Sequence, residues 1–244
     1  MTALLAIDTS TAWCSVALSL GQSTPLLRHQ KVSAGASGLL LPWIEELLAE
    51  ANITLQDLDA IAIGVGPGAF TGVRLGVAAV QGLAIAANLP VLPVCSLDAI
   101  AAQLSVSGPF NQAMTRDHAQ FVVAVDARMG EVYWAQYETQ PAALPRRMSE
   151  VMLSAPEEVD LSGAQFVAGS AIAEFGERLL ITAKPALPLA RMDSQIGVHA
   201  MGLLLQGQHL WDQGGQLEVH ALEPLYIRNK VALTTLEREN AFGV

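Results

Sequence analysis

The sequence predicts an α/β protein built from a duplicated unit with a cleft between the two copies. One observation is the central stretch 60–87, in which a short apolar run, a glycine-rich loop and an apolar helical run follow one another. The other is a repeat. Residues 4–8 and 121–126 are both buried-strand patterns that end in aspartate and lead through a tight turn into a returning strand. Two such openings indicate a duplication, and a chance match of two hairpins is the alternative.

The composition favours a globular protein that buries a partner surface. The 244 residues are 52% hydrophobic and only 15% charged, which is unusually apolar for a soluble monomer. No apolar run is expected to reach the length of a membrane span, and Met1 to Ile7 lacks the basic start of a signal peptide, so we expect a cytoplasmic protein. The net charge of −10 repels nucleic-acid backbones. Contact with a nucleic acid would therefore need a locally basic patch or a partner.

Three antiparallel strands, at 4–7, 14–20 and 26–32, are expected before any helix. Ser37 can then cap a helix that runs to about Ala51. The residues expected on the core stripe of this helix are Leu40, Ile44, Leu47, Leu48 and Ala51. Pro42 cannot donate the hydrogen bond that a helix interior needs, so we expect a kink or a late helix start there.

The central unit is predicted as a strand at 60–63, a loop at 64–72 and a helix at 73–87. Glycines before a helix often cradle phosphate, because exposed N–H groups and the helix dipole favour an anion. The loop fails both standard tests for such a site. A P-loop needs lysine after its last glycine, where this chain has Val73 and Arg74, and a dinucleotide fingerprint needs glycine where Thr71 stands.

The predicted helix 73–87 is apolar on all sides, which is typical of a helix that is buried all round. Small residues give it smooth surfaces, and valines and leucine supply bulk; they are Gly72, Gly76, Ala79, Gly82 and Ala86, and Val73, Val77, Val80 and Leu83. One side can face its own sheet. The other side must face a neighbouring helix, either from this chain or from another.

Beyond the central unit the pattern predicts a strand at 91–95 and a helix from Ser96 to Leu104 with Asp98 in its first turn. Residues 108–117 are expected to connect an N-terminal lobe, 1–107, to a C-terminal lobe, 118–244. In the second lobe we expect strands at 121–126, 131–137 and 166–168, a loop at 141–145, and helices at 171–180 and 196–206. The residues from Lys230 are expected to fray.

The residues that could carry chemistry are few. The five histidines show no metal-ligand spacing, and no cysteine lies near enough to one of them to suggest a metal site, so no metal and no cofactor is expected. The serine-hydrolase elbow is missing. Cys14 and Cys95 lie in apolar strand-like runs and are expected to be reduced core residues rather than a disulfide. A reactive thiol is the alternative.

Two aspartates, Asp8 and Asp126, end strands beside tight turns. If the two halves face each other, these turns flank the cleft, and the carboxylates with neighbouring hydroxyl groups could hold a metal-bound nucleotide. The alternative is that both bond the amides of their own turns. Arg128 is a candidate anion contact, because an unpaired guanidinium in a cleft turn can bind an anion.

Three segments together resemble the TsaB family, also called YeaZ. They are Ile7-Asp8-Thr9-Ser10, the run from Gly64 to Gly76, and the run from Asp126 to Tyr133, with a weaker match at Pro224 to Arg228. The resemblance covers residues 1 to about 140 in order. It implies a two-lobed fold like those of actin, sugar kinases and Hsp70. It also implies a role in making the threonylcarbamoyl modification of adenosine 37 of tRNAs.

The resemblance further implies a non-catalytic protein that activates TsaD, works with TsaC and the ATPase TsaE, pairs with itself when alone, and meets tRNA only through the complex. Catalytic relatives carry a His-x-x-x-His metal pair on the first helix, and residues 36–41 here contain no histidine. The first two helices are implied to pack against a partner as a bundle. The implied interface residues are Leu39, Leu40, Trp43, Val73, Gly76, Val77 and Val80. The residues that could face a nucleotide or anion are Asp8, Thr9, Ser10, Gly68 and Arg128.

A rival hypothesis makes this chain an enzyme of the same fold, either a nucleotide-dependent phosphotransferase or a glycoprotease. The missing histidine pair, P-loop lysine and serine elbow disfavour it.

Overall fold

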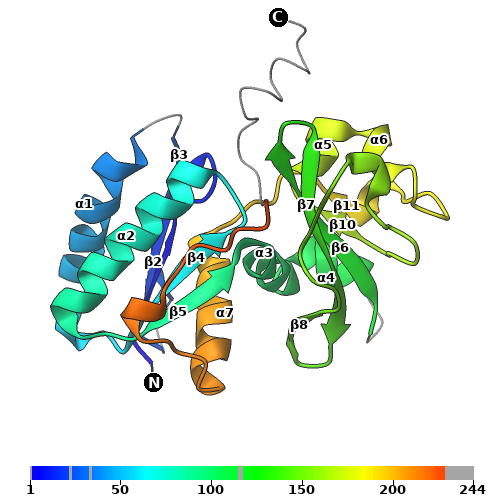
Figure 1. Ribbon diagram of the computed structural model, residues 1–244. Helices are drawn as coiled ribbons and strands as arrows, with labels where there is room; N and C mark the ends of the chain where they lie inside the picture. Colours follow the sequence, from blue (N-terminus) through cyan, green and yellow to red (C-terminus); the bar gives the residue numbers. More distant parts are fainter. Residues whose placement is uncertain (1, 22–23, 33–34, 115–117, 229–244) are drawn as a thin grey trace, which may run out of the picture.

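The computed structural model describes residues 2–21, 24–32, 35–114 and 118–228. Two lobes lie side by side, each built on one sheet (Figure 1). The N-terminal sheet has the order β3-β2-β1-β4-β5. Its strands are β1 (Leu4–Asp8), β2 (Trp13–Ser19), β3 (Leu26–Lys31), β4 (Ala60–Gly66) and β5 (Val91–Cys95). The first three are antiparallel, and β4 and β5 run parallel to β1. All five were predicted from the sequence.

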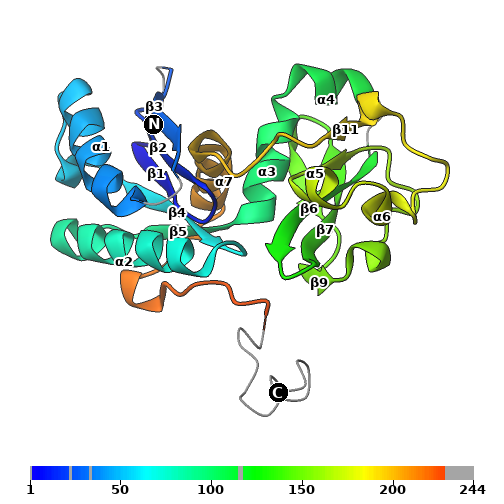
Figure 2. The same cartoon turned by 90° about the horizontal axis from the view of Figure 1, so that it is seen from above.

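Helices cover both faces of the N-terminal sheet. On the face of the sheet that points away from the other lobe lie α1 (Ala36–Glu50) and α2 (Phe70–Ala87), side by side in two perpendicular views (Figures 1 and 2). On the inner face, towards the other lobe, lie α7 (Ala200–Asp212) and α3 (Ser96–Ser105). The 3-10 turn η1 (Leu55–Asp57) precedes β4. The two faces bury separate apolar clusters, so the sheet is the middle layer of three.

The starts of these helices differ from the prediction. Ser37 does not cap α1, because the helix already begins at Ala36 after Gly35, whose φ is 102°. Pro42 lies inside the helix and does not delay its start. The carbonyl that loses its bond to Pro42 belongs to Gly38, which is exposed, so water can satisfy it. Helix α2 begins three residues before the predicted Val73, at Phe70, which shortens the glycine loop.

Helix α2 also corrects the expectation that no segment reaches membrane-span length. Its 18 residues have a mean hydropathy of 1.5, enough by length and composition to cross a membrane. In this structure the helix covers the sheet, and it contributes Val73, Val77, Val80 and Ala84 to the core. A helix that packs on a sheet passes the same test as a spanning one.

The C-terminal sheet has the order β11-β10-β6-β7-β8, and β9 pairs with β7. The hairpin β6 (Gln120–Arg128) and β7 (Glu131–Gln140) was predicted; β8 (Ala143–Arg147) was not, because the two prolines of 141–145 suggested a loop. The short strands are β9 (Met152–Ser154), β10 (Val167–Ala168) and β11 (Met192–Asp193). The predicted helix 171–180 is two helices, α5 (Ala171–Phe175) and α6 (Glu177–Leu180). Gly176, at φ 51°, separates them. The 3-10 turns are η2 (Pro156–Glu158) and η3 (Leu189–Arg191).

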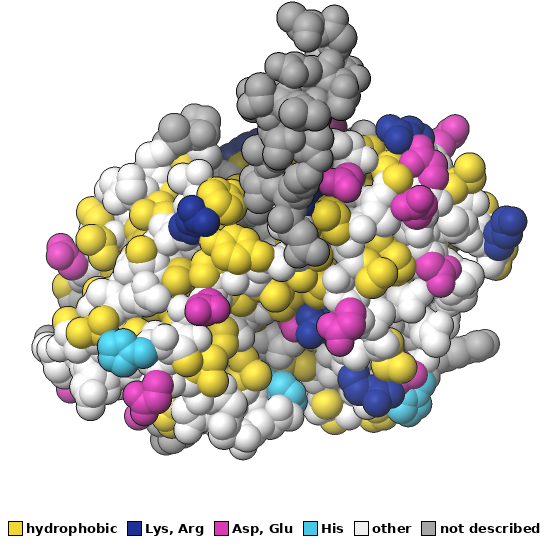
Figure 3. All heavy atoms as spheres, viewed as in Figure 1, with side chains coloured by type: hydrophobic (Ala, Val, Ile, Leu, Met, Phe, Trp, Pro, Cys, Tyr) yellow, Lys and Arg dark blue, Asp and Glu magenta, His cyan; other side chains and the backbone are white. Residues whose placement is uncertain are grey.

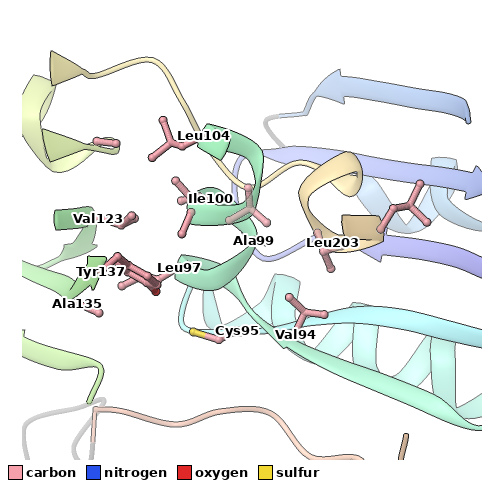
Figure 4. Packing of buried hydrophobic residues seen from close by; sticks show 14 of the residues in the cluster. Val94, Cys95, Leu97, Ala99, Ile100, Leu104, Val123, Ala135, Tyr137 and Leu203 are labelled. Carbon is pink, nitrogen blue, oxygen red and sulfur yellow. The ribbon is translucent and has the colours of Figure 1, made fainter. Parts of the chain in front are cut away.

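Helix α3 joins the lobes into one packed body. Its Leu97, Ile100 and Leu104 point towards the C-terminal sheet, where Val123 and Tyr137 lie, and Ala99 faces Leu203 of α7 (Figure 4). The predicted connection 108–117 contains a further helix, α4 (Gly108–Ala113), whose Phe110 is buried against Phe121 and Phe166. The apolar cluster therefore runs without interruption from one lobe to the other.

The predicted lobe boundary fails at the C-terminal end. Helix α7, expected at 196–206 in the second lobe, begins at Ala200 and packs on β1, β2, β4 and β5 of the first. Its buried Leu203 and Gly207 lie against α3 and the sheet. After α7, Leu217 bridges to Val91 at the edge of β5, and η4 (Val219–Ala221) packs on α2. The residues expected to fray, from Lys230, lie outside the described part of the chain.

Candidate functional site

The glycine loop packs closely against the turn between β1 and β2. Thr9 Oγ1 donates a 2.7 Å hydrogen bond to the carbonyl of Gly72, and the Ala69 N–H donates one of 2.6 Å to the carbonyl of Ser10. A Cβ on Gly72 would overlap the Thr9 carbonyl oxygen, and a Cβ on Gly68 would overlap that of Ser10. These glycines permit the close approach of two backbones. At Gly68 and Gly72 the loop is therefore packed against the chain itself.

Asp8 lies beneath this contact and not in an open cleft. Its carboxylate is fully buried and accepts hydrogen bonds from the Ser10 hydroxyl, at 2.7 Å, and from the Ser10 N–H, at 3.2 Å. Gly64 packs so closely that a Cβ there would overlap the carboxylate. Burial raises the pKa of Asp8 to about 7, although the bonds from Ser10 oppose the shift. Thr9 and Ser10 are buried as well, so these three predicted residues are closed off from solvent.

Arg128 is not the unpaired guanidinium that the sequence suggested. Its Nη1 lies 3.1 Å from the Asp126 carboxylate, and its N–H donates a 2.8 Å bond to Asp126 Oδ1. Asp126 therefore bonds the amide of its own turn, as the alternative interpretation had it. The Arg128 side chain remains 80% exposed, so the ion pair leaves most of the guanidinium open to water or an anion.

A small cavity of about 180 Å³ brings two of the predicted residues together. Gly68 lies on one wall and Arg128 on the other, so the cavity joins the glycine loop to the β6–β7 turn across the lobes. Its remaining lining residues are Pro67, Ala69, Phe70, Val73, Ala127, Tyr133, Leu225, Tyr226, Ile227 and Arg228. A larger cavity of about 850 Å³ lies between α4, the β7–β8 turn and α7, away from every predicted site residue.

Most of the predicted interface residues lie in the core of this chain. Val73, Gly76, Val77 and Val80 lie on the buried side of α2, and Leu40 lies on the buried side of α1. Leu39 and Trp43 are half-buried and pack against the same core. These five residues are therefore buried within this chain and do not form part of its outward surface.

The outward apolar residues of α1 and α2 were missed. Leu41 is 47% exposed, Phe70 41% and Ile85 59%. Arg74 stacks over Phe70, with its guanidinium carbon 3.7 Å from the ring centre. We call the exposed side of α1 and α2, with these four residues, the outer face. In Figure 3 hydrophobic side chains gather on the lobe that carries α2. Leu41 directly follows buried Leu40 and Ile85 directly follows buried Ala84, but α2 is apolar all round, so its sequence alone does not separate its exposed residues from its core residues.

A histidine cluster was also missed. The His29 ring stacks on Trp13 at a centroid distance of 4.5 Å and lies 4.1 Å from the His199 ring. His29 Nδ1 lies 2.9 Å from Ser15 Oγ, and His199 Nδ1 accepts a bond from the Met201 N–H at the start of α7. Burial, and the neighbouring His29, lower the pKa of His199 to about 4. This cluster fastens α7 to the first sheet.

The two cysteines are buried free thiols, as predicted. Burial raises the pKa of both to about 11, which opposes thiolate chemistry. Among the described residues no three His, Cys, Asp or Glu side chains gather as a metal-ligand set.

Comparison with known proteins places the chain in a family. A model for the family described as TsaD: tRNA N6-adenosine threonylcarbamoyltransferase matches residues 30–232. The tRNA threonylcarbamoyladenosine biosynthesis protein TsaB of Escherichia coli (strain K12) is 31% identical over 94% of this chain and 96% of that protein. TsaB of Haemophilus influenzae is 33% identical over 93% and 94%.

Solved structures agree with the sequence relatives. YeaZ from Pseudomonas aeruginosa matches with a TM-score of 0.79 and 34% identity, over 93% of this chain and all of that one. A second structure from Pseudomonas aeruginosa, described as an uncharacterized protein with similarity to peptidase YEAZ, matches with a TM-score of 0.80 and 36% identity. The expected two-lobed, actin-like fold is confirmed. Because these likenesses extend over nearly the whole chain, the chain belongs to the TsaB (YeaZ) family.

Proposed function

We propose that this protein is the non-catalytic partner of a TsaD-type enzyme in the threonylcarbamoylation of adenosine 37 of tRNAs. The observation that carries the proposal is the outer face, where Leu41, Phe70 and Ile85 leave apolar side chains exposed on two adjacent helices. Two helices that already lie side by side can complete a four-helix bundle with two helices of a related chain. The family relation to TsaB and TsaD supports a related chain as the partner.

The charges of α1 add a polar rim to this face. Glu45, Glu46 and Glu50 are exposed on its second half, and Arg28 of β3 pairs with Glu46 at 3.2 Å and with Glu50 at 2.9 Å. Glu45 lies beside that network without a salt bridge among the described residues. A partner with basic residues at the end of its bundle would therefore be favoured in orientation and association rate. The same face can pair two copies of this chain when the partner is absent.

The cavity between Gly68 and Arg128 is the proposed anion contact of this complex. Arg128 lines this cavity and its side chain is largely exposed, so a nucleotide phosphate arriving with the partner could bind there. Asp8, Thr9 and Ser10 are not part of this proposed anion contact, because they are buried and the glycine loop covers them. TsaC and TsaE would act in the same pathway, and tRNA would be held by the assembled complex.

The rival proposal is an enzyme of the same fold, a phosphotransferase or a glycoprotease. The buried Asp8 speaks against it, because the carboxylate that would hold a metal-bound nucleotide lies under Gly64. The purified chain should therefore neither hydrolyse ATP nor cleave a glycoprotein. Turnover of either substrate that disappears in Asp8→Asn would favour the rival.

The proposed function is tested with a pair of matched variants. Ile85→Glu places a charge on the outer face, and Ile181→Glu places the same charge on the other lobe, at a nearly equal exposure of 62% against 59%. A buried unpaired charge costs several kcal/mol, so Ile85→Glu should weaken binding to the TsaD partner by about 100-fold or more. Calorimetric titration measures the affinity, and thermal melting checks that both variants fold. Equal binding by both variants would place the interface elsewhere.

A further inference from the structure

We propose that Arg228 is a positioning residue that holds the β6–β7 turn, and with it Arg128, against the N-terminal lobe. It acts through the strap, the extended segment Leu222–Arg228 that crosses from α2 to the second lobe (Figures 1 and 2). The inference deepens the proposed function, on which its activity measurement rests. Its structural part concerns this chain alone.

The first end of the strap is fastened to the N-terminal lobe. Gln81 of α2 donates a 3.1 Å hydrogen bond to the Leu222 carbonyl, and the Leu225 N–H donates one of 2.8 Å to the Val65 carbonyl in β4. Further along, Arg74 Nε donates a 2.9 Å bond to the Tyr226 hydroxyl. These contacts tie the strap to the helix and strand on either side of the glycine loop.

The other end is fastened to a single turn of the C-terminal lobe. Arg228 Nη2 donates 3.2 Å hydrogen bonds to the carbonyls of Ala127 and Arg128, and it pairs with the Glu131 carboxylate. Its Nη1 lies 3.3 Å from Met129 Sδ. The guanidinium thus touches four residues of the turn, although about 100 residues separate it from them in sequence. Only 13% of its side chain is exposed.

The turn has a backbone that needs such support. Arg128 has φ 63° and Met129 has φ 57°, both in the left-handed region that L side chains rarely adopt. Residues held in such conformations persist where their surroundings leave no alternative. Arg228 lies outside the hairpin, and its hydrogen bonds to two carbonyls of this turn help to hold the backbone in that conformation.

The consequence is a defined distance between the walls of the small cavity. Gly68 is fixed by its contact with Ser10, and Arg128 is fixed by the turn that Arg228 holds. Since the strap residues Leu225, Tyr226, Ile227 and Arg228 also line the cavity, they close the gap between those walls. Arg228 does not itself need to contact a ligand; it sets where Arg128 can meet one.

Arginine is suited to this position and lysine is not. The Ala127 and Arg128 carbonyls and the Glu131 carboxylate all gather around Nη2, at the far end of the arginine side chain. A lysine ammonium group lies one bond nearer the backbone. It would keep a positive charge near Glu131 but would lose the hydrogen bond to at least one of the two carbonyls. The two variants Arg228→Gln and Arg228→Lys therefore separate the geometry from the charge.

Hydrogen–deuterium exchange of the isolated chain tests the structural part. Arg228→Gln should raise exchange in peptides covering 127–131 by about tenfold, since local opening then breaks fewer bonds. The matched control is Arg178→Gln, which removes an exposed arginine that pairs with Glu157 in the same lobe. That control should leave 127–131 unchanged. If Arg228→Gln also leaves these peptides unchanged while it melts with the parent, the strap does not hold the turn and the proposal is overturned.

The activity measurement uses the parent chain, its TsaD partner and the remaining pathway proteins. Arg228→Gln should bind the partner within about twofold of the parent but lower tRNA modification about tenfold, because the outer face is intact and Arg128 is displaced. Arg228→Lys should recover less than half of the loss. Full recovery by lysine, or a loss of partner affinity that accounts for the whole effect, contradicts a positioning role. A parent that fails to bind the partner refutes the proposed function instead, and the exchange result still decides the structural part.

Discussion

Thr9 and Gly72 are locked together by a hydrogen bond of 2.7 Å from the threonine hydroxyl to the glycine carbonyl, at a spacing that leaves no room for a side chain on residue 72. The contact joins the β1–β2 turn to the first turn of α2. It explains why the loop is rich in glycine although it lacks the sequence of a P-loop. The glycines of this loop serve packing between two backbones.

Gly72→Ala should therefore destabilise the fold strongly. The new methyl group overlaps a backbone oxygen that cannot move without breaking the turn, so we expect a loss of about 3 kcal/mol or more in the free energy of unfolding. Gly82→Ala in the same helix is the control, because no atom lies within 4 Å of its added Cβ. There the substitution should stabilise the helix by about 1 kcal/mol. Urea unfolding measures both, and equal effects would contradict the packing argument.

Asp8 should make stability fall as the pH rises through neutrality. The pKa of its carboxyl is raised from 3.8 to about 7 in the folded chain, so folding favours the protonated form. The stabilisation is complete below pH 3.8 and is lost as the pH rises through about 7, with a total of several kcal/mol. Asp8→Asn keeps a neutral side chain and removes this dependence. The melting temperature of the variant relative to the parent should therefore increase from pH 5 to pH 8.

A constant difference between Asp8→Asn and the parent over that pH range would show that the carboxyl does not titrate there. Comparing the two proteins at each pH cancels the contribution of every other titrating group.

The histidine cluster should act in the opposite direction at lower pH. The pKa of His199 is lowered from 6.5 to about 4, so the folded chain favours the neutral imidazole. Its stabilisation is present above pH 6.5 and is lost as the pH falls towards 4. His199→Asn can still accept a bond from the Met201 N–H, because asparagine is a good N-cap residue. The parent should lose stability between pH 6.5 and 4 relative to this variant, which thermal melting would detect.

The isolated chain should bind tRNA negligibly at physiological salt. It has 23 acidic and 13 basic residues, and neutralising phosphates is the main source of affinity for a nucleic acid. Fluorescence anisotropy with labelled tRNA should show no binding at micromolar protein, whereas the complex with the TsaD partner should bind. Submicromolar binding by the chain alone would contradict the assignment of tRNA contact to the complex.

The sequence by itself determined the local elements and the family. Strands β1, β2, β4 and β6 are short apolar or alternating runs bounded by turn residues, and such runs form strands in most contexts. The repeat of strand, aspartate and tight turn predicted the two lobes. The glycine run 64–76 is specific enough to indicate the TsaB family from the sequence alone.

Only the tertiary structure decided which side of each helix or strand faces the core and which side faces solvent. Helix α2 is apolar all round, so its sequence could not tell Val77, which lies on the sheet, from Ile85, which lies in solvent. Proline-containing β8 became a strand because β7 offered it an edge. Helix α7 joined the first lobe although it follows the second in sequence, since burying Leu203 and Gly207 against that sheet and α3 is a long-range contact with no local signal. Asp8 was visible in the sequence as a cleft residue, and only the fold placed Gly64 and the glycine loop over it.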